Sequence, residues 1–498
     1  MRRRAVLAGV AATASVTAAG VVATSSPALA NGGAFDVKDF GAIGDGTTSD
    51  RVAIQKAFDA VPSQGGSVYL PVGTFSVDAP GLTIHDKSNF TLGGPGKLLL
   101  SGTGSVVNGY IGVKLSGTCK NITLNGVHIQ GDGVASHNHA GVWTGQSAVL
   151  TNIRVLFCEI QGVVTGIQAG HGQVSTVVGW KTIGNHLKNI VGVDSGQGYG
   201  IVSSGAVDTQ IIGNRIEGAQ RHSIYISAGS RVVCSGNVIR DHRQGVGLGN
   251  TLMSALVIAR TSDVVCTGNL ITNVWDNAIE IVPDDDMPVR NVVCSNNVVT
   301  GVNAGPSAVW IGGDPAANRV MSHVDFSHNV IRLNSSDVTG LRLRYGKNMT
   351  VRSNEFIYDG VTAEAYGIEV ACDSETAGTT LYSDHLAFED NTITASSGDG
   401  PLFGVRLNPA ACIAGTRMSF RNNKLNSTLS GDFWNTGAWV DNTNIWYRDQ
   451  SVAGFGWNTG LRPSAEIAGA GASFWDTITS KMIFSNGAAW RYADGTAV

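Results

Sequence analysis

Acidic, aromatic and basic residues take the same place in one repeated segment of this sequence. The segment is a small residue followed by apolar-x-apolar, and its central residue is, in order along the chain, Trp143, Gln168, Val202, Tyr225, Val257, Glu280, Trp310, Arg342, Glu369, Arg406 and Trp439. Strand alternation points Glu280 away from its apolar neighbours Ile279 and Ile281. Outward tryptophan beside arginine and carboxylate suits a saccharide, because sugar rings stack on aromatic faces and sugar hydroxyls need polar partners.

Further carboxylates follow four residues after this central position. Asp284 follows Glu280 and Asp314 follows Trp310, so their backbones are expected roughly 5 Å apart on neighbouring repeats. Two carboxylates held close push their pKa values apart, which provides the acid and the base that glycoside hydrolysis requires. The candidate acid, base or nucleophile residues are Glu280, Asp284, Asp285 and Asp314.

The other members of the row would bind the substrate. We expect Trp310 to be the stacking platform, Arg342 and Arg344 to anchor the substrate, and Glu369 to contribute a further polar contact. Two alternatives remain for the Asp284–Asp286 turn, which could be a solvated acidic turn or a calcium site. No other metal and no cofactor is expected.

A second cluster precedes the acidic one. His222 and Tyr225 occur with other basic and polar residues on nearby repeats, namely His171, Lys181, Arg221, Asp241, His242 and Arg243. Positive groups beside tyrosine or histidine can neutralise a uronate carboxylate and remove the proton α to it, which is the chemistry of β-elimination. Arg344 could serve a uronate in the acidic cluster instead. The alternative is that these are surface residues of a long β face.

An asparagine recurs once in each repeat and indicates how the chain positions these residues. It follows Gly or another small or polar residue inside an alternating apolar segment, at Asn185, Asn214, Asn237, Asn269, Asn297, Asn329, Asn354, Asn391 and Asn423. A recurrence of about 20 to 50 residues, with β-branched runs and no helical period, predicts stacked turns of a parallel β-solenoid. Asparagine tolerates positive φ and could mark a tight corner, and its stacked amides could hydrogen-bond along the ladder.

Three residues before the asparagine, a second column predicts the core. Cys234, Cys266 and Cys294 align there, and later repeats have Phe326, Phe388 and Phe420. These cysteines are therefore expected to be buried free thiols, with Cys372 and Cys412 as an alternative pair.

Composition agrees with a turn-rich β protein. Gly is abundant at 65 residues, charged residues make up 14%, and 34 Lys and Arg nearly balance 38 Asp and Glu. These values do not fit a disordered or nucleic-acid-binding chain, and an acidic substrate would have to be selected by local placement of charge.

The first thirty residues read as an export signal. Arg2, Arg3 and Arg4 precede a weakly apolar run that ends at Ala28-Leu29-Ala30, which is similar to a twin-arginine signal or, alternatively, an ordinary secretory signal or an uncleaved anchor. We expect a secreted mature chain from about Asn31, with no membrane association after signal removal.

Residues 35 to 80 contain the most specific pattern. Phe35-Asp36-Val37-Lys38-Asp39-Phe40-Gly41-Ala42 leads to Gly44-Asp45-Gly46, then to an amphipathic helix from about Val52 with Ser49 or Asp50 as N-cap, and then to the strand Ser67-Val68-Tyr69-Leu70 before Pro71. A helix at this place suits a lid over the first turn of a solenoid.

This stretch closely resembles the amino-terminal signature of the pectate-lyase-like superfamily, which includes family 28-type polygalacturonases, pectate lyases, alginate C5-epimerases and phage tailspikes. The resemblance implies an all-β fold: a single-stranded right-handed parallel β-helix with an N-terminal capping helix and a small C-terminal β cap. The expected division is 1–30 signal, 31–110 cap and first coils, 111–445 β-helix, and 446–498 a C-terminal cap or tailspike-like tip.

The catalytic residues of these families cannot be assigned to positions of this sequence. Gly170-His171-Gly172 precedes Asp284-Asp285 here, whereas the polygalacturonase motifs have the reverse order, and the sequence has no N-T-D, no R-I-K and no D-P-H-E epimerase motif. Three functions therefore stay open: a glycoside hydrolase or transglycosidase as first choice, a polysaccharide lyase, or a non-catalytic polysaccharide-binding protein of tailspike type. The chain would be a monomer or a homotrimer.

Overall fold

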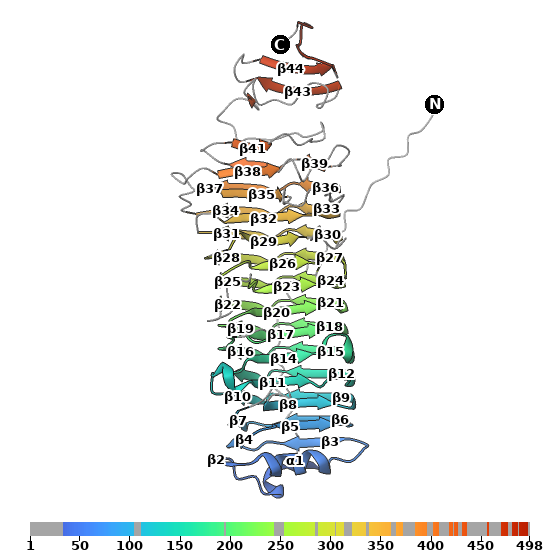
Figure 1. Ribbon diagram of the computed structural model, residues 1–498, viewed down its shortest axis with the longest axis vertical. Helices are drawn as coiled ribbons and strands as arrows, with labels where there is room; N and C mark the ends of the chain where they lie inside the picture. Colours follow the sequence, from blue (N-terminus) through green and yellow to red (C-terminus); the bar gives the residue numbers. More distant parts are fainter. Residues whose placement is uncertain are drawn as a thin grey trace, which may run out of the picture.

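The protein is a right-handed parallel β-solenoid in which each turn contributes one strand to each of three sheets. A computed structural model describes residues 33–103, 111–193, 196–243, 253–283, 287–303, 305–312, 321–334, 338–359, 365–371, 384–395, 402–407, 418–421, 423–426, 431–435, 456–457, 470–476, 481–486 and 488–496. Figure 1 shows the turns stacked along one axis, with the chain rising from α1 at the lower end. The fold class predicted from the sequence is confirmed.

The first sheet, sheet A, has fourteen strands in parallel order. They are β1 (Ala34–Asp36), β3 (Gly66–Tyr69), β6 (Ser88–Gly93), β9 (Thr118–Asn125), β12 (Val149–Leu156), β15 (Thr176–Ile183), β18 (Ala206–Ile212), β21 (Ser230–Ser235), β24 (Ser262–Thr267), β27 (Val289–Ser295), β30 (Met321–Ser327), β33 (Gly346–Arg352), β36 (Asp384–Glu389) and β39 (Met418–Arg421).

The second sheet, sheet B, also has fourteen strands. They are β2 (Asp45–Ser49), β4 (Thr74–Val77), β7 (Lys97–Leu100), β10 (His128–Gln130), β13 (Glu159–Gln161), β16 (His186–Lys188), β19 (Arg215–Glu217), β22 (Val238–His242), β25 (Leu270–Val274), β28 (Val298–Val302), β31 (Val330–Leu333), β34 (Glu355–Tyr358), β37 (Thr392–Ala395) and β40 (Lys424–Asn426).

The third sheet, sheet C, carries the row of central residues singled out above and has thirteen strands. They are β5 (Leu82–His85), β8 (Ile111–Ser116), β11 (His139–Thr144), β14 (Thr165–Ala169), β17 (Tyr199–Ser204), β20 (His222–Ser227), β23 (Leu256–Ala259), β26 (Ile279–Val282), β29 (Ser307–Gly312), β32 (Thr339–Arg344), β35 (Ala365–Ala371), β38 (Leu402–Leu407) and β41 (Gly431–Asn435).

The N-terminal end of the solenoid is covered by the helix α1 (Arg51–Ala60), which buries Ile54, Ala57 and Phe58. Asp50 stands at the N-cap position, but its carboxylate accepts hydrogen bonds from the backbone of Ile43 (2.6 Å) and Gly44 (3.1 Å) instead of from the helix. Asp50 therefore joins the turn before β2 to the start of the capping helix. Short 3₁₀ turns, η1 (Val37–Phe40), η2 (Ala135–His137) and η3 (Gly172–Val174), complete the helical content of the described chain.

The interior is a set of stacked apolar columns. Cys234, Cys266 and Cys294 pair in register, and Phe326, Val351, Phe388 and Phe420 continue that column on later turns. The three cysteines are fully buried free thiols, as the sequence predicted. Cys372 and Cys412 lie outside the described residues.

The recurring asparagines form a continuous buried ladder. Asn297, for example, donates through Nδ2 to Oδ1 of Asn329 (2.9 Å), while its own Oδ1 accepts from the Nδ2 (2.9 Å) and the backbone N (3.0 Å) of Asn269. The same pattern joins neighbours from Asn185 to Asn423. The predicted amide ladder is confirmed.

The expectation that these asparagines take positive φ is wrong. From Asn185 to Asn391, the residue with positive φ is the one before each asparagine, such as Gly184 (φ 67°), Gly213 (φ 63°) and Asn296 (φ 56°). Glycine relieves the steric cost of that conformation, which frees the next residue to turn its amide inward.

A separate four-stranded sheet follows the solenoid, with β42 (Gly456–Trp457), β43 (Ala470–Asp476), β44 (Lys481–Asn486) and β45 (Trp490–Tyr492). Figure 1 shows β43 and β44 beyond β41, at the end opposite α1. The export signal expected at 1–30 lies outside the described residues. No helix in the described part of the chain is long and apolar enough to cross a bilayer.

Candidate functional site

The outward row of sheet C follows one register from turn to turn. Tyr225 pairs with Val257, Val257 with Glu280 and Glu280 with Trp310. The pairing continues to Arg342, Glu369 and Arg406. Each step is one strand spacing of about 4.8 Å, so these residues are neighbours on one face, as the sequence alignment predicted.

The last member of that alignment was wrong. Arg406 pairs with Trp434 in β41, not with Trp439. Trp434 follows the apolar residue Phe433 and Trp439 follows the small residue Ala438. The sequence pattern alone therefore does not decide between the two positions. Trp439 lies outside the described residues.

Arginines and a buried carboxylate organise the C-terminal half of the row. Glu369 is only 6% exposed and lies between Nε of Arg342 (3.1 Å) and Nη1 of Arg406 (3.4 Å). Arg342 and Arg344 place their guanidinium groups 5.1 and 5.3 Å from the ring centre of Trp310. Glu369 thus positions the arginines, and the two guanidinium groups that contact Trp310 make this end of the face positive.

A denser cluster of aromatic and basic residues surrounds His222. The rings of His222 and Tyr225 are stacked, with centroids 5.3 Å apart and an interplanar angle of 18°. Tyr199, on the preceding turn, contacts both rings at 5.4 and 5.7 Å, and the guanidinium of Arg221 lies 5.2 Å from the Tyr199 ring centre. Four side chains from β17, β20 and the residue before β20 therefore meet on sheet C.

The protonation state of His222 follows from its surroundings. Its Nδ1 lies 2.7 Å from the backbone oxygen of Ser254, so Nδ1 carries the proton and donates, which leaves Nε2 as the acceptor nitrogen. Burial lowers the pKa of His222 to about 3, against the opposing effect of the bond to Ser254 and together with the nearby charge of His242 and Arg221. The imidazole is neutral at neutral pH.

Two further groups of the cluster have properties set by burial. Burial raises the pKa of Tyr199, and the charge of Arg221 opposes that rise. Nε of Arg221 is buried and has no hydrogen-bond acceptor among the described residues. Arg221 as a whole is only half-buried, so its positive charge makes this part of the face favourable to an anionic ligand.

The His222 cluster and the acidic cluster are connected through one residue. Ser254 accepts the hydrogen bond of His222 with its backbone oxygen, and its hydroxyl donates to Oε2 of Glu280 at 2.5 Å. Asn277 donates to the same hydroxyl oxygen at 3.3 Å and is fully buried, as is Ser254. The residues around His222 and around Glu280, which the sequence suggested as two separate candidate sites, thus share one polar network.

Three of the predicted catalytic residues, Asp284, Asp285 and Asp314, lie outside the described residues. Of the acidic set, Glu280 alone is placed, half-buried in β26. The binding candidates Tyr225, His222, Trp310, Arg342, Arg344 and Glu369 all lie in strands of sheet C.

Lys181, expected near His222, is on another sheet. It lies in β15 of sheet A and pairs with Arg154 and Gln210, because each turn of the chain visits three sheets and proximity in sequence does not select one. His171 remains beside sheet C, where Nε2 of Gln168 lies 3.2 Å from its Nδ1, and burial lowers its pKa.

Sequence reasoning missed Tyr199 and Ser254. Aligning Y-G-I-V with H-S-I-Y on their shared isoleucines would have placed Tyr199 beside His222, which is the pairing that the strands adopt. Ser254 offered no such signal. It precedes β23 and so lies outside the repeated apolar pattern, and it holds His222 through a backbone oxygen, which the sequence does not reveal.

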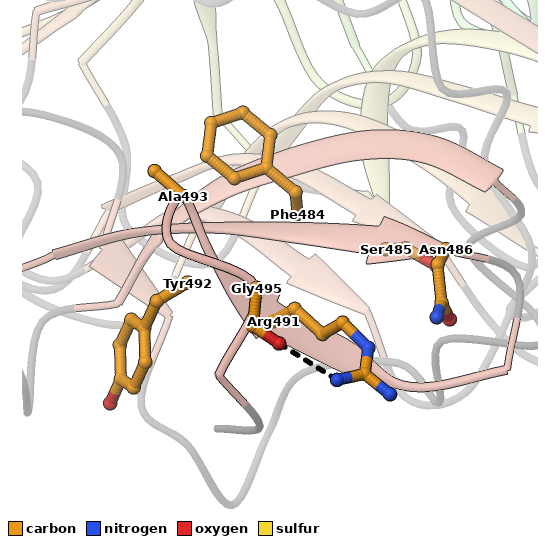
Figure 2. A pocket seen from close by; sticks show the side chains of 7 residues that line it. All are labelled: Phe484, Ser485, Asn486, Arg491, Tyr492, Ala493 and Gly495. Atoms are coloured by element: carbon orange, nitrogen blue, oxygen red, sulfur yellow. Dashed lines mark hydrogen bonds between the residues drawn. The ribbon is translucent and has the colours of Figure 1, made fainter.

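Two depressions lie away from this row. One of about 410 Å³ is lined by Asp241, His242, Arg243, Asn273, Trp275 and Asn303 at the ends of sheet B strands, and His242 there donates from Nε2 to the backbone oxygen of Arg221 at 2.6 Å. The other, of about 390 Å³, is on the C-terminal sheet, where Figure 2 shows Arg491 bonded to Gly495 beside Tyr492 and Phe484. The first depression adjoins the backbone that holds Arg221.

Two family models match consecutive parts of the chain. One described as "Rhamnogalacturonase A/epimerase, pectate lyase-like" matches residues 34–251, and one described as "Right handed beta helix region" matches residues 254–445.

Curated relatives match over shorter stretches. Mannuronan C5-epimerase AlgE6 of Azotobacter vinelandii is 30% identical over 142 residues, which is 26% of this chain and 16% of that protein. Alginate lyase 7 of the same organism is 46% identical over 67 residues, or 12% of this chain and 8% of that protein. The chain thus spans less than a fifth of the length of either relative.

Solved structures to which the chain is similar match it at low identity. The A-module of the Azotobacter vinelandii epimerase AlgE4 has a TM-score of 0.45 at 18% identity and covers 84% of this chain and 100% of its own. A tailspike protein of the Escherichia coli bacteriophage HK620 has a TM-score of 0.47 at 14% identity, covering 83% and 78%. With its amino-terminal signature and its observed solenoid, the chain belongs to the pectate-lyase-like superfamily of right-handed parallel β-helix proteins.

Proposed function

We propose that this protein is a polysaccharide lyase that removes the proton α to the carboxylate of a uronate and cleaves the polymer by β-elimination at the His222 cluster. The observation that carries the proposal is the convergence of a neutral imidazole, a phenol and a guanidinium on one face. Relatives named as uronate epimerases and an alginate lyase support the same substrate class.

Arg221 would bind the uronate carboxylate. A proton next to an ionised carboxylate is hard to remove, because a second negative charge must develop on the same group. A guanidinium that pairs with the carboxylate disperses that charge and stabilises the enolate in the transition state. The net charge of −4 gives no general attraction for a polyanion, so the local arginine has to supply it.

His222 would be the base and Tyr225 the acid. Nε2 of His222 takes the C5 proton, the C5–H electrons form the enolate, and the C4–O bond then breaks as the Tyr225 hydroxyl protonates the leaving oxygen. The bond from Nδ1 to Ser254 orients the ring and stabilises the imidazolium as it forms. The bound carboxylate also raises the affinity of His222 for a proton, which offsets the effect of burial.

The stacked arrangement of the two rings limits the stereochemistry. His222 and Tyr225 lie side by side on β20, so both approach a sugar from one face. Elimination with base and acid on one face requires H5 and O4 on the same side of the ring, as in manno- and gluco-configured uronates. In galacturonate the two groups are on opposite sides. The substrate class proposed is therefore a mannuronate or glucuronate polymer.

Glycoside hydrolysis at Glu280 is the second candidate. The short hydrogen bond from Ser254 fixes one oxygen of Glu280, and Trp310 on the next turn offers a sugar platform. Hydrolysis needs a second carboxylate, for which Asp284, Asp285 and Asp314 remain the candidates. Under the first proposal, Glu280 instead orients Ser254 and the substrate.

One set of incubations separates these functions. The protein is mixed with polymannuronate, a glucuronate polymer, polygalacturonate and neutral glucans. Lyase action gives new reducing ends together with an absorbance near about 235 nm, because elimination leaves a C4–C5 double bond. Reducing ends without that absorbance support hydrolysis, and inverted uronates seen by NMR without chain cleavage support epimerisation. Binding without any chemical change rules out all three enzymatic functions and leaves a tailspike-like binding protein.

A further inference from the structure

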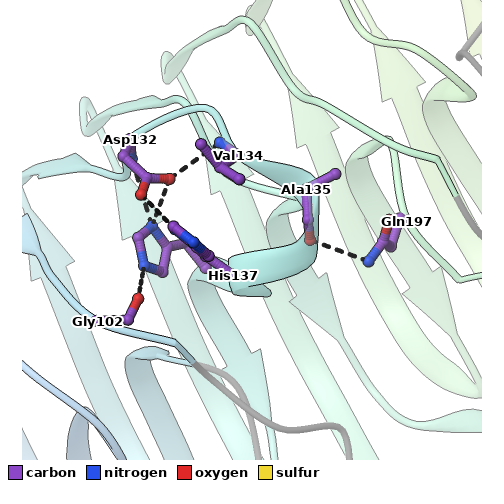
Figure 3. A network of polar contacts seen from close by, with 7 residues as sticks. Gly102, Asp132, Val134, Ala135, His137 and Gln197 are labelled. Carbon is purple, nitrogen blue, oxygen red and sulfur yellow. Dashed lines mark hydrogen bonds and ion pairs between the residues drawn. The ribbon is translucent and has the colours of Figure 1, made fainter.

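A compact group of two histidines and an aspartate lies outside the row of sheet C residues. Asp132 and His137 belong to the loop that connects β10 to β11 and contains η2, His139 is the first residue of β11, and one potential ligand atom from each lies within 4.8 Å of the others. Figure 3 shows Asp132 and His137 pointing toward one another at the start of this loop, with Gly102 on the neighbouring turn. Nothing in the proposed elimination uses these three side chains.

The tautomer of His139 can be assigned from its partners. Nε2 lies 2.9 Å from the carbonyl oxygen of Gly102, which can only accept, so Nε2 carries the proton. Nδ1 lies 3.3 Å from the backbone N–H of Asp132, which can only donate, so Nδ1 presents its lone pair. A carbonyl that fixes the outer nitrogen of a buried imidazole is the usual support of a metal-binding histidine.

The Nδ1 lone pair of His139 also lies close to a carboxylate oxygen, which like Nδ1 is a hydrogen-bond acceptor. Oδ1 of Asp132 lies 3.3 Å from the same Nδ1, and the His139 side chain is 1% exposed. Two electron-rich atoms held this close repel each other, most strongly on the buried imidazole side, and a cation between them turns the contact into an attractive one. Two ligands at 2.0 to 2.1 Å from one tetrahedral zinc ion are themselves about 3.3 Å apart.

His137 completes the set from the solvent side. Its Nδ1 lies 2.6 Å from Oδ2 of Asp132, a contact in which the imidazole donates its proton and which an ion would replace. Asp132 and His137 are about one-third exposed, at 38% and 34%, so water can complete the coordination. We propose that Asp132, His137 and His139 bind one divalent transition-metal ion, of which zinc is the best match.

The ligand types decide between classes of metal. Two imidazole nitrogens and one carboxylate oxygen suit zinc and its first-row neighbours, whereas calcium and magnesium prefer all-oxygen sites. The site is therefore chemically different from a calcium site at the Asp284–Asp286 turn, the only metal position that the sequence suggested.

The ion would hold the loop that contains η2 in one conformation. Gln197 donates from Nε2 to the backbone oxygen of Ala135 (3.2 Å) and to Oδ1 of Asn138 (2.8 Å), which joins the loop to the segment that enters β17 at Tyr199. Figure 3 shows the contact between Gln197 and Ala135. Metal binding would thus fix the loop against the strand that carries one ring of the His222 cluster.

The test is metal binding by the full chain after treatment with a chelator. Zinc is titrated by calorimetry, and cobalt is titrated in parallel because its visible absorption reports tetrahedral nitrogen and oxygen coordination. We expect one ion per chain, weakened at least 10-fold in His137→Ala and in Asp132→Asn. Both positions are partly exposed, so the variants are expected to fold, and circular dichroism checks this.

His85→Ala is the matched control, because His85 also contacts an aspartate, Asp86, at 3.1 Å but belongs to no group of three potential ligands in the part of the chain that the structure describes. It should bind zinc as the wild type does. Failure of the wild-type chain to bind a stoichiometric ion, or undiminished binding by His137→Ala, would overturn the proposal. None of these readouts depends on polysaccharide cleavage.

Discussion

His222 and Glu280 are joined through Ser254, whose backbone oxygen accepts from Nδ1 of His222 at 2.7 Å and whose hydroxyl donates to Glu280 at 2.5 Å. The imidazole and the carboxylate lie two turns apart on sheet C, with Val257 between Tyr225 and Glu280 in the register. The two candidate sites suggested by the sequence are one network, and substitutions at its two ends can tell which end does the chemistry.

The first prediction compares His222→Gln with Glu280→Gln. If His222 is the base, His222→Gln lowers kcat on polymannuronate by about 10²- to 10⁴-fold, the usual contribution of a positioned acid or base. Glu280→Gln keeps an oxygen that accepts from Ser254 and should lower kcat less than about 10-fold. Steady-state kinetics of both variants make the comparison. The reverse order of effects would assign the chemistry to Glu280.

Ser254→Ala provides an internal control for that comparison. The substitution removes the hydroxyl that bonds Glu280 but leaves the backbone oxygen that holds His222. Activity should therefore resemble that of Glu280→Gln. A loss as large as that of His222→Gln would show that the hydroxyl, and not only the carbonyl, is needed.

The second prediction concerns the positive end of the face. Trp310→Ala removes the ring that Arg342 and Arg344 contact, so KM for the polymer should rise several-fold with little change in kcat, as expected for loss of cation–π and stacking contacts worth about 1–2 kcal/mol. Phe157→Ala, at an exposed aromatic after β12 on a different sheet, is the control and should leave KM unchanged. A large fall in kcat for Trp310→Ala would place it at the reacting sugar.

The sequence predicted the architecture well because the solenoid repeats its physical constraints at every turn. The buried asparagine ladder and the cysteine column each have a fixed place relative to an apolar pattern, and the register of Glu280, Trp310 and Arg342 follows from that place. Lys181 was misplaced because composition does not say to which of three sheets a polar residue belongs. The link through Ser254 could not be predicted, since it combines a backbone oxygen, which any residue would have, with a hydroxyl outside the repeated apolar pattern.

The third prediction tests the ladder itself. Asn297→Ala removes the acceptor of two hydrogen bonds from Asn269 and the donor to Asn329, all in the core. Unsatisfied buried groups cost about 1–3 kcal/mol each, so the urea midpoint of unfolding should fall clearly. Asn303→Ala, at an exposed position that bonds Asn273 near the surface, should shift the midpoint little. Equal midpoints for the two variants would contradict a structural role of the ladder.

The fourth prediction is a pH dependence of stability. Burial lowers the pKa of His222 to about 3 and that of His242 to about 4, whereas both are near 6.5 in the unfolded chain. The unfolded state binds more protons between these values, so this contribution to stability is complete above about pH 6.5 and is lost as the pH falls toward 4. Each histidine adds a slope of up to about 1.4 kcal/mol per pH unit. Urea unfolding from pH 4 to 7 should show a shallower slope in His222→Gln, and an unchanged slope would contradict a neutral buried imidazole.

The account rests on removal of the C5 proton by His222, which is measured most directly with a mannuronate polymer carrying tritium at C5. We predict that the wild-type protein releases tritium into water at the rate at which the unsaturated product forms, and that His222→Gln slows both by about 10²- to 10⁴-fold. Cleavage of the polymer with the tritium fully retained would contradict the account and would assign the reaction to hydrolysis instead.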